Sequence, residues 1–227
     1  LTPEMVLVGR TPKKIAALLA EGREKYGIHI KEGIEPLQDK RCAEAVMKEG
    51  AEYPLTDSQM GVYLECINYP ETTMYNIPMC CELPAGLDGE RFRDAVKKAV
   101  AMHPAFGVNI ALSKGTPVMC IHPEFLRAEV GEWETEDIEA VKRTFVRPFR
   151  LEGEPLYRMA LYHNKEHYYF LFDVHHIVFD GTSVKVFLDE ISQLYQGGNP
   201  KAEEISLMDL SAYEETLAET PQYQAAR

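Results

Sequence analysis

Hydrophobic residues recur along this chain with both of the periods that distinguish helices from strands. After Asp88, a preferred helix N-cap residue, apolar residues follow the 3.6-residue period of a helix as far as His103. These apolar positions are Phe92, Ala95, Val96, Ala99 and Val100. Pro104 cannot continue a helix, so the pattern predicts one amphipathic helix that ends before this proline.

Further helices are predicted from capping residues and shorter apolar stripes. We expect Thr56, Thr135 and Ser183 to be N-caps, because their hydroxyls can accept a bond from a backbone N–H in the first turn. Gly197 and Gly198 are expected to end the helix that begins near Ser183. The predicted helices cover residues 56–64, 135–145, 183–195 and 207–217.

Strand-forming residues occur in five runs between the predicted helices. These runs cover residues 78–83, 107–112, 117–121, 155–163 and 167–175. The turn dipeptide Lys114-Gly115 joins the second run to the third, and the polar loop 164–166 joins the last two as a hairpin. The sequence therefore predicts an α/β (α+β) fold, in which a mixed, largely antiparallel sheet is covered by helices.

The N-terminal part of the chain has a different character. Residues 2–21 suggest a helix, with Thr11 as its cap and Pro12 at its first position. Residues 22–52 are charged and contain several glycines without a sustained period, so we interpret them as a linker with a short helix near 40–48.

Composition limits the classes of function. The 227-residue chain has a formal net charge of −12, which argues against binding to nucleic acid or to an anionic membrane surface. Its five cysteines form no CxxC pair, so a disulfide framework is not expected and a reducing cytoplasm is the simplest location. No apolar run is long enough for a membrane span.

The segment Asp173 to Gly181 carries the strongest chemical signal. His175 and His176 stand at the end of a predicted strand, followed by Asp180 and Gly181. Histidine can take up and return a proton near neutral pH, which suits acyl transfer. An aspartate can fix a ring or hold a loop, and a glycine lets the backbone approach a substrate closely.

Strand alternation separates the two histidines. If the strand runs straight to its end, Phe172, Val174 and His176 share one face, while Asp173 and His175 share the other. Two ligands of one metal ion must converge, so this geometry disfavours a metal site made by the pair. It favours one imidazole that reaches a cavity and one that holds the loop. Asp180-Gly181 could equally be a turn, so spacing alone leaves a purely structural role open.

The pattern resembles the condensation domains of nonribosomal peptide synthetases, a branch of the chloramphenicol acetyltransferase-like superfamily. The family signature HHxxxDG matches His175-His176-Ile177-Val178-Phe179-Asp180-Gly181. Other segments match family motifs in the same order, namely residues 53–59, 75–78, 149–151 and 155–158. One motif departs from the family pattern: where the family usually has Arg-His-Glu-x-Leu-Arg, the chain has Met102-His103-Pro104-Ala105-Phe106-Gly107.

The resemblance implies a fold, a reaction and its partners. Residues 53–227 would be the N-terminal lobe of a condensation domain with a two-layer sandwich fold; residues 23–52 would be a linker, and residues 1–22 the last helix of an upstream carrier domain. The reaction would form an amide between two thioesters on phosphopantetheine arms, with no cofactor bound directly. Upstream and downstream carrier domains, a C-terminal lobe in cis and an adenylation domain are the implied partners.

The resemblance also implies roles for the site residues. His176 would position or deprotonate the attacking amine, His175 and Asp180 would give structural support, and the Gly181 amide would help orient the substrate. In the family, the aspartate typically pairs with an arginine, which the sequence does not identify. Because half of the channel would be missing, the isolated chain is expected to be inactive. An epimerization domain, a standalone acyltransferase and a non-catalytic carrier-docking module are the alternatives.

Overall fold

The computed structural model describes residues 48–201 and 205–218. The helix predicted for residues 2–21 lies outside the described residues, as does the one near 40–48 except for Lys48, which is not helical. The described residues form helices and strands, as predicted from the two hydrophobic periods, and the strands are arranged in two sheets.

The larger sheet has four strands in the order β2-β7-β6-β5. These strands are β2 (Asn76–Pro84), β5 (Gly131–Glu134), β6 (Tyr157–His163) and β7 (His167–His175). β7 lies in the middle and pairs antiparallel with both β2 and β6, whereas β5 joins the edge in parallel with β6. The predicted hairpin of β6 and β7 is confirmed, and the parallel strand β5 was not predicted.

The smaller sheet has three antiparallel strands in the order β1-β4-β3. They are β1 (Glu52–Pro54), β3 (Val108–Ser113) and β4 (Thr116–Ile121). Lys114 and Gly115 form the turn between β3 and β4, and both have a positive φ (52° and 85°). This turn was predicted, whereas the short strand β1 was not.

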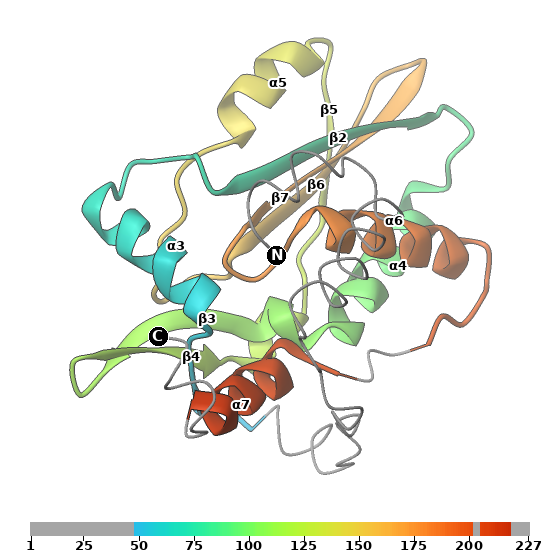
Figure 1. Cartoon of the computed structure of the whole chain (residues 1–227). Helices are drawn as coiled ribbons and strands as arrows, with labels where there is room; N and C mark the ends of the chain where they lie inside the picture. The colour runs from blue at the N-terminus through green and yellow to red at the C-terminus, as the bar shows by residue number, and fades with distance from the viewer. Residues whose placement is uncertain (1–47, 202–204, 219–227) are drawn as a thin grey trace, which may run out of the picture. The chain divides into compact units, whose positions relative to one another are not determined.

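Five α-helices surround the sheets in the described part of the chain. They are α3 (Asp57–Asn68), α4 (Gly89–Met102), α5 (Ile138–Phe145), α6 (Gly181–Tyr195) and α7 (Leu207–Ala218). Two short 3-10 helices, η1 (Pro104–Gly107) and η2 (Pro123–Leu126), follow α4 and β4. In Figure 1, α4 and α6 lie together on one side of the four-stranded sheet and α5 lies on the other.

The main core lies between the four-stranded sheet and the helix pair α4–α6. Phe170 and Phe172 of β7 are fully buried on this side. The Phe170 ring meets the Phe92 ring of α4 with their centroids 5.2 Å apart, and the Phe172 ring meets the Phe187 ring of α6 at 5.9 Å. Edge-on aromatic contacts of this kind add to the free energy gained by burial.

Two predicted N-caps were wrong, and both helices begin near an aspartate instead. The cap of α6 is Asp180, whose carboxylate accepts bonds from the Ser183 N–H and the Ser183 hydroxyl. The cap of α5 is Asp137 rather than Thr135. In both cases the aspartate carboxylate accepts from an N–H three residues along. The predicted Thr56 cap is confirmed and forms a capping box with Gln59.

Candidate functional site

His175, the last residue of β7, has a buried ring that is held from two sides. Its Nδ1 accepts a bond from the Ile177 N–H at 3.1 Å, and its Nε2 lies 3.5 Å from the Sγ of Cys66 in α3. The His175 backbone N–H donates to the Leu156 carbonyl at 2.9 Å. The ring therefore ties the turn after β7 to both the strand end and helix α3.

The bonds around His175 fix its tautomer and its charge. Burial, the neighbouring His176 and Arg158 together lower the pKa of His175 to about 4, so the ring is neutral at pH 7. Because Nδ1 accepts from a backbone N–H, the single proton of the neutral ring lies on Nε2 and is donated to Cys66 Sγ. Burial raises the pKa of the Cys66 thiol, so this pair is not prepared as a thiolate nucleophile with a base.

His176 differs from its neighbour. It lies beyond the end of β7 and is exposed, and its backbone N–H donates to the Tyr75 carbonyl at 2.7 Å. Among the described residues, its ring makes no hydrogen bond or ion pair. The two rings thus occupy different environments: His175 is buried at the end of β7, whereas His176 lies in the turn beyond the strand and is exposed.

Asp180 and Gly181 stand at the start of α6, close in sequence to the two histidines. The bonds from Ser183 lower the pKa of the Asp180 carboxyl, which is exposed. No arginine is among the hydrogen-bond or ion-pair partners that the described residues give it. A Cβ placed on Gly181 would meet nothing within 4 Å, so the space beside this backbone is open. The structure therefore brings His175, His176, Asp180 and Gly181 together around one turn.

A buried ion pair beside this turn was not predicted. Arg158 of β6 lies directly across from Asp173 of β7, and its Nη1 is 2.9 Å from Asp173 Oδ2. Burial raises the pKa of Asp173 and lowers that of Arg158 to about 10. The sequence does contain a signal for this pair, since Asp173 interrupts an otherwise apolar strand two residues before His175.

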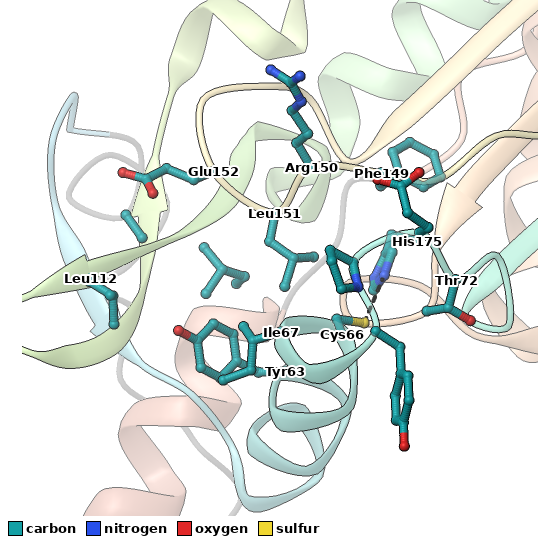
Figure 2. Close-up of a pocket in the computed structure, with 15 residues that line it drawn as sticks. Tyr63, Cys66, Ile67, Thr72, Leu112, Phe149, Arg150, Leu151, Glu152 and His175 are labelled. Carbon is teal, nitrogen blue, oxygen red and sulfur yellow. Dashed lines mark hydrogen bonds between the residues drawn. The ribbon is translucent and has the colours of Figure 1, made fainter.

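A pocket of about 610 Å³ opens beside His175. Figure 2 shows His175 and Cys66 side by side in its wall, with the dashed contact between them, and the residues Phe149 to Glu152 along another wall. Tyr63, Ile67 and Leu112 contribute apolar surface. His175 lines this pocket and His176 does not, although the resemblance gave the acting role to His176.

Two kinds of site find no support in the described residues. No group of three or more histidine, cysteine, aspartate or glutamate side chains in residues 48–201 and 205–218 could hold a metal ion. Over the same residues, every helix is too short or too polar to cross a membrane.

Comparison with known proteins identifies the family. The family model described as "Condensation domain" matches residues 49–227. Tyrocidine synthase 3 of Brevibacillus parabrevis is 32% identical over 173 residues, which are 75% of this chain and 3% of that protein. Surfactin synthase subunit 1 of Bacillus subtilis (strain 168) is 29% identical over 174 residues, which are 75% of this chain and 5% of that protein.

Solved structures show the same fold. The starter condensation domain of rhizomide synthetase superimposes with a TM-score of 0.65 at 17% identity, over 76% of this chain and 45% of that one. The first condensation domain of the CDA synthetase gives a TM-score of 0.63 at 21% identity, and the match covers 77% of this chain and 48% of that one. The chain thus covers less than half of each solved domain and a small part of the curated relatives.

The chain covers about as much of each solved domain as one lobe would, and its fold is the one that the resemblance in sequence implied. This chain belongs to the condensation domain family of nonribosomal peptide synthetases.

Proposed function

We propose that this chain supplies the histidine-bearing lobe of a condensation domain that joins a carrier-bound donor to a carrier-bound aminoacyl acceptor through an amide bond. The observation that carries the proposal is the contrast between the two adjacent histidines. His175 is buried, neutral and committed to the turn, whereas the His176 ring is exposed and has no partner in the described residues. This division supports one supporting and one acting imidazole.

In the proposed reaction, the acceptor amine attacks the carbonyl carbon of the donor thioester. The C–N bond forms, the C–S bond breaks, and the proton lost by the nitrogen ends on the sulfur of the donor phosphopantetheine arm. His176 positions the amine or takes its proton, and general-base help of this kind contributes about 10²–10⁴-fold. Orientation of two tethered reactants supplies much of the rest, because it replaces an encounter between free molecules.

The other site residues act through position. His175 fixes the turn through Ile177 and Cys66, and Asp180 fixes the first turn of α6. The Gly181 amide, at the open start of α6, orients the substrate. Upstream and downstream carrier domains present the two thioesters, and a second lobe closes the channel. On this account the isolated 227-residue chain forms no amide.

The reaction class can be tested in the full-length protein that carries this chain. Its carrier domains are loaded with a donor and an acceptor, and the carrier-bound products are released and analysed by mass spectrometry and chiral chromatography. The proposal predicts an amide-linked product on the downstream carrier. A D-configured aminoacyl group without amide formation would indicate epimerization instead, and an absence of any reaction would contradict the proposal.

A further inference from the structure

We propose that Arg158 and Asp173 form a positioning pair, which holds one wall of the pocket and both histidines of the turn in place for the reaction. The inference rests on the proposed function, because it assigns the pair to the same site. Neither side chain is placed in contact with the reacting atoms. They act through the backbone segment 147–149 and through Asn76.

The pair is built into the middle of the sheet. Asp173 is fully buried in β7, and the side chain of Arg158 is 12% exposed. The Asp173 Oδ2 atom, which Arg158 contacts, also accepts a bond of 2.7 Å from Asn76 Nδ2 in β2. One carboxylate oxygen therefore joins three adjacent strands.

Arg158 also holds the segment that leads to the pocket wall. Its Nη1 donates to the Arg147 carbonyl at 2.6 Å, and its Nη2 donates to the Pro148 carbonyl at 3.3 Å. The guanidinium lies over the Phe149 ring, 3.7 Å from the ring centroid. A planar, forked cation can make all of these contacts at once, which a lysine ammonium cannot do.

From this segment the contacts reach His175. The Phe149 ring meets the His175 ring edge-on, with their centroids 5.7 Å apart and an interplanar angle of 89°. Further along, the Leu151 carbonyl accepts a bond of 2.8 Å from the Ile110 N–H, which fixes the same wall to β3. Arg158 thus sets the position of a ring that packs directly against the supporting histidine.

A second route reaches His176. Asn76 donates to Asp173 Oδ2 and, from the same Nδ2 atom, to the Arg147 carbonyl at 3.0 Å. The preceding residue, Tyr75, provides the carbonyl that accepts the backbone N–H of His176 at 2.7 Å. The position of the acting histidine therefore depends on a strand end that the same carboxylate anchors.

The energetics indicate that the Arg158–Asp173 pair positions the pocket wall rather than stabilises the folded chain. Burying both charges costs much of the free energy that their attraction supplies, so an apolar pair of similar volume is often as stable. Asp173 Oδ1 also has no hydrogen-bond partner in the described residues, which adds to the cost. What an apolar pair cannot reproduce is the set of bonds to the carbonyls of residues 147 and 148.

The double variant R158M/D173L tests this in the full-length protein. We expect its melting temperature and its donor loading to be those of the wild type, while the rate of amide formation falls by about 10²-fold, because small displacements of reacting groups cost rates of that order. The control is R93M/E132L, which removes another partly buried ion pair, between α4 and β5. It should keep the wild-type rate.

Two outcomes would overturn the proposal. The first is a double variant that condenses at the wild-type rate, because the pair would then not position the site. If the double variant does not fold, R158K gives the independent measurement, because it keeps the charge opposite Asp173 but lacks the forked guanidinium and its stacking on Phe149. A wild-type rate in R158K would also contradict the proposal.

A readout without amide formation separates this inference from the proposed function. Alkylation of Cys66 by iodoacetamide is followed by peptide mass spectrometry in the full-length protein, with Cys120 as the internal reference. A wall released by R158M/D173L should expose Cys66, which is 8% exposed, and raise its rate of labelling while that of Cys120 stays the same. Unchanged labelling of Cys66 would show that other contacts hold the wall. Wild-type protein without condensation activity would contradict the proposed function alone.

Discussion

From Phe170 to His175 both faces of β7 are buried, but one face is apolar and the other carries polar side chains. Phe170, Phe172 and Val174 are each 0% exposed and pack toward α4 and α6. On the other face, Leu171 is followed by Asp173 and His175. The first face stabilises the fold by burial of apolar surface. The second face is less favourable, because burying Asp173 and His175 costs free energy that their hydrogen bonds offset only in part. Side-chain alternation along one strand therefore gives an apolar face that packs in the core and a polar face that carries the Asp173–Arg158 ion pair and His175.

The sharpest test of the apolar face is Phe172→Ala. Removing this fully buried ring leaves a cavity between β7 and α6, and the free energy of unfolding should fall by about 3–5 kcal/mol. Chemical denaturation of the 227-residue chain measures the change. A loss no larger than that of an exposed substitution would show that this face does not form the core.

The polar face should make stability depend on pH. Because the pKa of His175 is lowered to about 4 from 6.5, the unfolded chain binds a proton between these values that the folded chain does not. The contribution of His175 to stability is therefore complete above pH 6.5 and falls as the pH drops toward 4, with a slope of up to about 1.4 kcal/mol per pH unit. His175→Gln should flatten this slope in denaturation curves recorded from pH 7 to pH 4.

The smallest expected effect lies just beyond the strand, at the start of α6. Asp180→Ala removes the N-cap and should lower the free energy of unfolding by about 1 kcal/mol. Ser183→Ala keeps the bond from the Ser183 backbone N–H to Asp180 and should cost less. If Ser183→Ala were the more damaging of the two in urea denaturation, the assignment of the cap would be wrong.

Much of the fold follows from local sequence. The helix α4 was predicted at both ends because a capping aspartate and a proline bracket a regular apolar stripe. The strands β1 and β5 escaped prediction because they are short and lack alternation. β5 consists of Gly131-Glu132-Trp133-Glu134, and it is a strand because it pairs with β6, which is distant in sequence. The cap of α6 was misplaced because aspartate and serine are both good N-caps. Only the structure shows that the Asp180 carboxylate accepts the hydrogen bond from the Ser183 N–H.

The site was predictable in part. Alternation predicted that His175 and His176 differ in environment, because that property is local, but it did not predict that His175 lines the pocket while His176 lies beyond the strand. The pairing of Arg158 with Asp173 depends on the register of two strands, and the link to Phe149 depends on a loop that packs across them. The polar loop 164–166 predicts a hairpin, but it does not fix which residues of the two strands pair, and a shift of one residue is possible. A buried carboxylate needs a partner, yet the sequence alone does not name it.

The most direct test of the account is the single-turnover rate of amide formation by His176→Ala in the full-length protein, with preloaded donor and acceptor carriers. His167→Ala, which removes a half-buried histidine at the other end of β7, is the control. We expect His176→Ala to lower the rate by about 10²–10⁴-fold while donor loading and melting temperature are unchanged. Amide formation by His176→Ala at the rate of the control would contradict the account.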